Sequence, residues 1–285
     1  MFFSVSAGGP GPSARGPRPS SSPWLVAALA LVLALAHGDA TGAQLRRALL
    51  PAAREAPQAV RSVIFVHGMT CRACTMLLDR RLGATPGVYW NRFNFPLRLL
   101  VVYHDPAVAP PDSILALVGS SGELRAEALR SALVSALPPG EETTLASWKG
   151  GALSAKEAQA EIDRFAASLG KTDVVEGSEE WDQFSYEIIG EAVRGRILRE
   201  RAAAAGFRTG PPGTTLPAVI PREFYWPAHA LAPTPEEAGV ARFLREQVLL
   251  GDEGDKGRAR FDDWLLALWR AIDLDFRAEA REAAP

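Results

Sequence analysis

The segment RSVIFVHGMTCRAC, residues 61–74, constrains the fold of this chain more than any other part of the sequence. A β-branched and aromatic run over residues 63–66 predicts a buried strand, which Gly68 ends. The residues that follow predict a helix, because Thr70 can cap its first turn and Pro86 lies where it must stop. We expect its apolar face to consist of four residues: Met76, Leu77, Leu78 and Leu82.

Both cysteines of the chain, Cys71 and Cys74, lie in this segment as one CxxC pair. The pattern places Cys71 on the loop between strand and helix and Cys74 near the first turn of the helix. Unpaired backbone N–H groups and the helix dipole favour the thiolate form there, and thiolates are ligands for soft metal ions. The spacing alone leaves three interpretations open: a metal site, a redox couple or a structural disulfide.

The next 60 residues predict one small domain. Residues 88–95 and 99–106 read as two strands of a hairpin, and a short helix follows, with Pro111 at its start and Gly119 near its end. Residues 123–129 can supply a last edge strand. The resulting order β-α-β-β-α-β is that of the ferredoxin-like split βαβ arrangement.

Residues 61–130 resemble a heavy-metal-associated (HMA) domain, the fold of copper chaperones, of the N-terminal modules of metal-pumping P-type ATPases and of the periplasmic mercury-binding protein. The family signature GMTCxxC stands here as residues 68–74. A second match consists of Gly87-Val88, Asn94 and the run VYHDP at residues 102–106. The resemblance implies that Cys71 and Cys74 are the metal ligands. It also implies that four neighbours support the metal loop, with Met69 packed inside: Gly68, Met69, Thr70 and Arg72.

Two departures from the family pattern concern the choice of metal. Arg72 stands between the cysteines, where a small residue is often found, and Glu123 lies near the loop in which the family usually has an aromatic residue or a lysine. The resemblance implies Cu(I) as the bound ion, with Hg(II) or Zn(II) as alternatives. It also implies a partner protein that donates or accepts the metal, with transfer of the ion between the two proteins by ligand exchange.

The second half of the chain resembles no family that we can name. Residues 131–152 read as a Pro/Gly-rich linker and residues 153–285 as a helical domain. The first helix of that domain carries a capping box, Ser154 with Glu157. The predicted fold class is therefore α+β: a ferredoxin-like βαββαβ domain at residues 61–130, followed by an all-α module.

Residues 1–43 predict export. A Gly/Pro/Ser-rich stretch precedes the apolar run at residues 24–36, which is shorter than the 20 or so residues that a spanning helix needs. We expect a signal peptide and a periplasmic or extracellular protein. The alternative is that residues 24–36 associate with the membrane as an uncleaved anchor.

Composition and motifs narrow the function further. The formal net charge of −2 and the absence of a Lys/Arg run argue against a nucleic-acid partner. No nucleophile elbow or phosphate-binding glycine loop occurs, and Asp262 and Asp263 read as ordinary acids at a helix start, so we expect no enzyme. Two other functions stay open: a thiol-disulfide oxidoreductase that uses the same CxxC, and a protein-interaction module in which the HMA fold is a scaffold.

Overall fold

The computed structural model describes residues 58–70, 72–122, 124–134, 144–169, 179–211, 214, 217 and 234–278. The predicted export segment, residues 1–43, and the side chains of Cys71, Arg72 and Glu123 lie outside the described residues. Gly42–Pro285 forms one compact unit.

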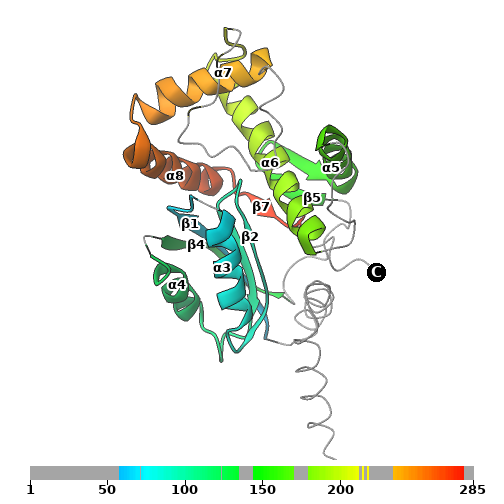
Figure 1. Ribbon diagram of the computed structural model, residues 1–285, viewed down its shortest axis with the longest axis vertical. Helices are drawn as coiled ribbons and strands as arrows, with labels where there is room; N and C mark the ends of the chain where they lie inside the picture. Colours follow the sequence, from blue (N-terminus) through cyan, green and yellow to red (C-terminus); the bar gives the residue numbers. More distant parts are fainter. Residues whose placement is uncertain are drawn as a thin grey trace, which may run out of the picture. The chain divides into compact units, whose positions relative to one another are not determined.

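The first half of the described chain is a four-stranded sheet with two helices, shown in blue to green in Figure 1. The strand order is β2-β3-β1-β4, and every neighbouring pair is antiparallel. This is the ferredoxin-like arrangement, and the prediction of an α+β fold is confirmed. The elements are β1 (Val60–His67), α3 (Arg72–Gly83), β2 (Val88–Asn94), β3 (Leu99–His104), α4 (Pro111–Gly119) and β4 (Arg125–Leu133).

The two central strands of the sheet, β1 and β3, are buried on both faces. Successive side chains of a strand point to opposite faces, and in β1 the residues Ile64 and Val66 join the core beneath α3 and α4. Val63 and Phe65 point the other way and belong to a second core, which includes Tyr186 and other residues of the second half. Burial on both faces explains why residues 63–66 of β1 and 99–103 of β3 are continuously apolar rather than alternating.

The second half is not all helical. It contains a three-stranded antiparallel sheet of order β6-β5-β7, so the prediction of an all-α module is not confirmed. Residues 131–152, predicted as a linker, include the end of β4, all of β5 and the start of β6. The elements are β5 (Thr144–Trp148), β6 (Gly151–Ser154), α5 (Ala155–Leu169), α6 (Glu179–Ala204), α7 (Pro235–Phe243), the π-helix η2 (Leu244–Leu249), α8 (Gly254–Ala271) and β7 (Asp275–Phe276).

The helix that follows the metal loop, α3, buries a different face from the one predicted. Met76 and Leu77 are 59% and 60% exposed, whereas Leu78 and Leu82 are buried. Each helical residue is rotated by about 100° from the last, so three consecutive residues cannot share one face. The buried stripe follows the i, i+3, i+4 rule instead, through Thr75, Leu78, Asp79 and Leu82.

Helix α6 packs closely on strand β2 at Asn94. The Nδ2 group of Asn94 donates a hydrogen bond to the carbonyl of Tyr186 (2.6 Å), and its Oδ1 accepts one from the amide of Leu97 (3.1 Å). A Cβ atom at Gly190 would lie 2.0 Å from the Oδ1 atom of Asn94. Glycine is therefore required at position 190 for the helix to reach the strand.

The start of α5 has the predicted capping box. The amide of Ser154 donates to the Glu157 carboxylate (2.9 Å), and the amide of Glu157 donates to the Ser154 hydroxyl (3.2 Å). Arg196 of α6 donates to the same carboxylate (2.9 Å). The hydrogen bond from Ser154, followed by that from Arg196, lowers the pKa of Glu157 to about 2 from its ordinary value of 4.5.

This lowered pKa predicts an acid-dependent loss of stability. The stabilisation is complete above pH 4.5 and is lost as the pH falls toward 2, because the unfolded chain takes up the proton first. Glu157 is 47% exposed, so solvent screening limits the effect to about 0.5–1 kcal/mol. Urea unfolding at pH 7 and pH 3 should show that Glu157→Gln removes this part of the pH dependence. Glu161→Gln, which removes only the ion pair with Arg164 on the same helix, should retain it. An unchanged pH profile in Glu157→Gln would contradict the assignment.

Candidate metal centre

Cys74 lies in the first turn of α3, directly after the loop that leaves β1. Its side chain is half-buried and packs against the core beneath α3 and α4. Cys74 is disulfide-bonded in the structure. The sequence contains one other cysteine, Cys71, which lies outside the described residues.

The loop between β1 and Cys74 is held by its own residues. Gly68 has a φ of 77°, a left-handed conformation that suits glycine and turns the chain out of the strand. Met69 is 1% exposed and belongs to the core beneath α3 and α4, whereas Thr70 is exposed. The buried methionine anchors the loop to the core, and Thr70 directly after it lies at the surface.

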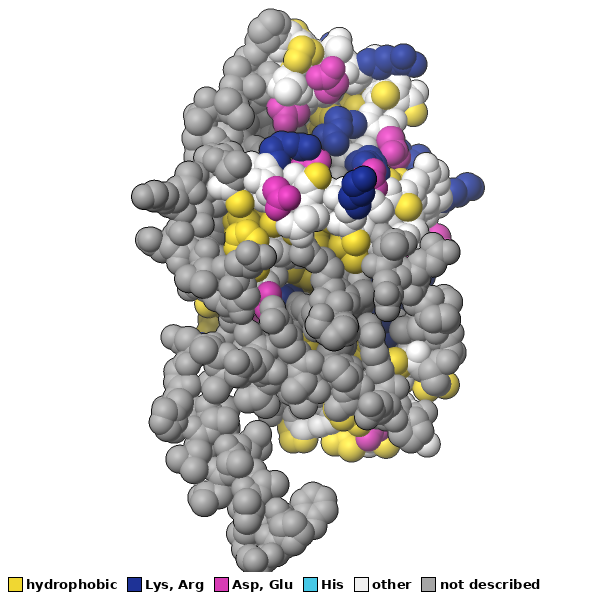
Figure 2. Space-filling view, turned by 90° about the vertical axis from the view of Figure 1, so that its right-hand side faces the viewer, with side chains coloured by type: hydrophobic (Ala, Val, Ile, Leu, Met, Phe, Trp, Pro, Cys, Tyr) yellow, Lys and Arg dark blue, Asp and Glu magenta, His cyan; other side chains and the backbone are white. Residues whose placement is uncertain are grey.

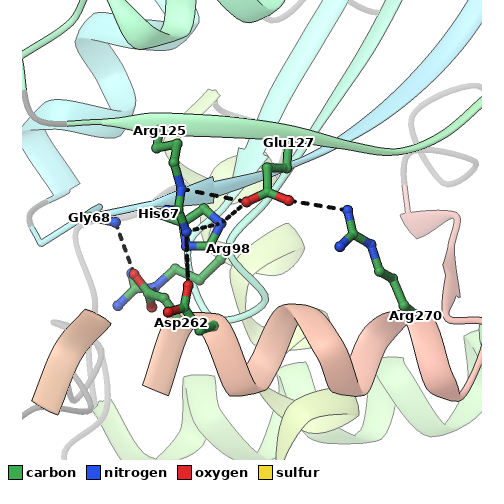
Figure 3. A network of polar contacts seen from close by, with 8 residues as sticks. His67, Gly68, Arg98, Arg125, Glu127, Asp262 and Arg270 are labelled. Atoms are coloured by element: carbon green, nitrogen blue, oxygen red, sulfur yellow. Dashed lines mark hydrogen bonds and ion pairs between the residues drawn. The ribbon is translucent and has the colours of Figure 1, made fainter. Parts of the chain in front are cut away.

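The second half of the chain contacts this loop through α8. The amide of Gly68 donates a hydrogen bond to Oδ2 of Asp262 (2.9 Å), and Oδ1 of Asp262 lies 3.5 Å from Nε of Arg98. Figure 3 shows the carboxylate between the loop above and its helix below. Both Asp262 and Arg98 are buried. The interpretation of Asp262 as an acid at a helix start is wrong, because α8 begins at Gly254 and Asp262 lies two turns further on.

His67 closes the same network from the end of β1. Its Nε2 lies 3.1 Å from Oε1 of Glu127, its Nδ1 lies 3.5 Å from Oδ1 of Asp263, and Arg125 approaches both ring nitrogens. Burial, followed by the charge of Arg125, lowers the pKa of His67, against the opposing effect of the carboxylates. His67 thus lies between the carboxylates of Glu127 in β4 and Asp263 in α8.

Sequence reasoning did not identify Arg98, Glu127 or Asp262 as part of this region. They come from three segments that are far apart in the chain, and each is a common residue in an ordinary sequence context. The pairing of β1 with its neighbouring strands places Arg98 and Glu127 beside the end of β1, and α8 brings Asp262 to the same place (Figure 3).

The donor set near the loop fits a soft ion better than a hard one. Two sulfurs suit Cu(I) or Hg(II), whereas a hard cation needs several oxygen ligands. Within the described part of the chain, no group of three or more His, Cys, Asp or Glu side chains could hold a metal. A metal at the CxxC pair would thus depend on the two cysteines, and on their being reduced.

Figure 2 shows Lys/Arg and Asp/Glu side chains interspersed over the described part of one face. Among the described residues, no helix has the length and apolar character needed to span a membrane.

No protein-family model matches the chain, and no curated protein matches it. One similar solved structure is the N-terminal domain of a potential copper-translocating P-type ATPase from Bacillus subtilis in the Cu(I)-loaded state. It is 24% identical to this chain, and the match covers 26% of this chain and 91% of that domain, with a TM-score of 0.25.

Proposed function

We propose that this protein is an exported carrier of one soft metal ion, which Cys71 and Cys74 hold as thiolates. The observation that carries the proposal is the position of Cys74, in the first turn of α3 after a loop that buried Met69 anchors. Backbone N–H groups at a helix start favour thiolate sulfur. The two-sulfur donor set fits Cu(I) best, with Hg(II) and Zn(II) as alternatives.

The disulfide at Cys74 sets a condition for metal binding. A dithiol reductant must first supply two electrons and two protons, which gives two thiols here and a disulfide in the reductant. The thiols then lose their protons as they take the ion. Transfer to a partner proceeds when a partner thiolate enters the coordination sphere before the first sulfur leaves.

Cu(I) titration of the anaerobically reduced protein tests the proposal. One equivalent should bind tightly, and both Cys71→Ser and Cys74→Ser should abolish stoichiometric binding because a single thiolate remains. Met76→Ala is the matched control, since it removes an exposed sulfur close to Cys74 in the same helix. If the serine variants bind as the unsubstituted protein does, or if the reduced protein binds no Cu(I), the proposal is wrong. Parallel titrations with Hg(II) and Zn(II) decide the preferred ion.

The disulfide at Cys74 favours one second candidate, a thiol-disulfide oxidoreductase. In that reaction a substrate thiolate attacks one sulfur of the pair, and the second substrate thiolate resolves the mixed disulfide. The substrate is then oxidised by two electrons, and the protein retains two thiols. In the reverse reaction the reduced pair reduces a substrate disulfide, and a dithiol reductant restores the pair. An insulin-reduction assay with dithiothreitol as that reductant separates the two functions, because a metal carrier should not accelerate insulin reduction above the rate with dithiothreitol alone.

A further inference from the structure

The buried carboxylate of Asp262 is the contact that ties the second half of the chain to the metal loop. Asp262 is 3% exposed, and its hydrogen bond comes from Gly68, three residues before Cys71. Gly68 leaves the strand in a left-handed conformation, so its amide orientation sets the direction in which the loop departs. The carboxylate fixes that orientation from outside the ferredoxin-like domain (Figure 3).

Arg98 makes this contact a charged one. Its Nε lies 3.5 Å from Asp262, and its guanidinium lies 4.5 Å from the centre of the Phe95 ring. The carbonyl of Arg98 accepts a hydrogen bond from the amide of Val66 (2.9 Å). The arginine therefore links the β2–β3 turn, the end of β1 and α8 in one cluster.

Such a cluster is a poor way to gain stability. A buried ion pair loses much of its attraction to desolvation, and apolar residues of similar size often stabilise a protein as well or better. The ion pair instead fixes the orientation of the Asp262 carboxylate, because one oxygen accepts from the Gly68 amide and the other faces the Arg98 guanidinium. The exposed neighbour Asp263, which is 62% exposed and contacts Arg125, lacks this confinement.

We propose that Asp262 is a positioning residue for the two-cysteine site: from α8 it holds the Gly68 amide and so sets the direction in which the chain leaves β1 toward Cys74. The inference rests on the proposed function, because its first test measures the Cu(I) affinity of the protein. A loop that is already held in one conformation loses less conformational entropy when the ion binds. Residues that support metal ligands in this way change metal affinity by about 10–100-fold. The second half of the chain thereby tunes the affinity of a site that lies in the first half.

Cu(I) affinity of Asp262 variants in the full chain, measured by competition with a chromophoric Cu(I) chelator, tests the inference. Asp262→Ala removes both contacts and should weaken binding by about 10–100-fold. Asp262→Asn keeps an oxygen acceptor for the Gly68 amide but removes the negative charge that faces Arg98. It should weaken binding less than Asp262→Ala does, by about threefold. Asp255→Asn, at an acid that is 94% exposed in the first turn of the same helix, should bind as the unsubstituted protein does.

Weaker Cu(I) binding by an Asp262 variant could also follow from a general loss of stability of the protein, and a control variant separates the two causes. Trp269→Phe, a conservative core variant on the same helix, removes one buried hydrogen bond and should leave Cu(I) affinity unchanged. If Asp262→Ala does not fold, Asp262→Asn carries the test. Unchanged affinity in every folded Asp262 variant, or an equal loss in Trp269→Phe, would overturn the inference.

A second readout keeps this test distinct from that of the proposed function. The equilibrium of the cysteine pair with glutathione can be measured without metal, and Asp262→Ala should shift its equilibrium constant about tenfold, or about 30 mV. If the unsubstituted protein binds no Cu(I) but Asp262→Ala shifts this equilibrium, the proposed function fails and the positioning role stands. If Cu(I) binds but neither affinity nor equilibrium responds to Asp262, the positioning role alone fails.

Discussion

Residues 58–134 produced without the rest of the chain should not form a stable, soluble domain, although they contain the whole ferredoxin-like sheet. One face of that sheet is covered by the second half and would become exposed. Its apolar side chains are each at most 4% exposed in the protein: Val63, Phe65, Trp90, Leu99, Val101 and Tyr103. At about 1.5–3 kcal/mol for each side chain, their exposure forfeits up to roughly 9–18 kcal/mol.

That loss is as large as the whole stability of an ordinary domain, about 5–15 kcal/mol. The isolated fragment should therefore aggregate or bind a hydrophobic dye, and it should lack a cooperative unfolding transition. A fragment with a dispersed amide spectrum and a cooperative transition would contradict the prediction.

A paired substitution gives the control. Val63 and Val101 lie opposite each other in neighbouring strands. Changing both to Thr should make the fragment more soluble, because the face is then in contact with water. The same change should destabilise the full chain, because the hydroxyls are buried there at a cost of about 1–3 kcal/mol each.

Trp269→Ala should lower the free energy of unfolding of the protein by about 3–5 kcal/mol. Trp269 is 1% exposed on α8, and its indole Nε1 donates a hydrogen bond to the carbonyl of Leu97 in the β2–β3 turn (3.0 Å). The substitution thus opens a large cavity and leaves a buried carbonyl without this donor. Urea unfolding followed by far-UV circular dichroism measures the change.

Trp269→Phe separates the two contributions. It keeps most of the packing and loses the hydrogen bond, and it should cost about 1–3 kcal/mol. Trp264, which is only partly buried on the same helix, gives a matched comparison, since Trp264→Ala should cost less than Trp269→Ala. A cost below about 1 kcal/mol for Trp269→Ala would show that α8 is not part of a shared core.

The sequence predicted the ferredoxin-like half well because its information is local. The strand at residues 63–66, the glycine that ends it and the helix that Pro86 follows are each encoded within a few residues. The capping box at Ser154 is likewise a short-range pattern, and the structure contains it. The prediction of the apolar face of α3 was wrong, because Met76, Leu77 and Leu78 are all apolar but successive helical residues point in different directions. Only Leu78 of the three is buried.

The continuous apolar runs of β1 and β3 also indicate that both faces of the sheet are covered at these two strands. A strand with one face in water alternates apolar and polar residues, whereas the LLVVY of β3 does not. This pattern indicates that something covers the second face. It cannot indicate what, because any apolar helix of the chain satisfies it.

The sequence by itself determined a ferredoxin-like domain and a CxxC pair at a helix start, since short-range periodicity and turn residues specify both. Only the tertiary structure decided that strand β7, more than 120 residues beyond β5, completes a second sheet with it. It alone decided that Asp262 reaches Gly68 across 194 residues. Contacts between residues so far apart in the chain depend on how the whole core packs. The sequence around an aspartate in an amphipathic helix does not indicate which backbone amide will donate to it.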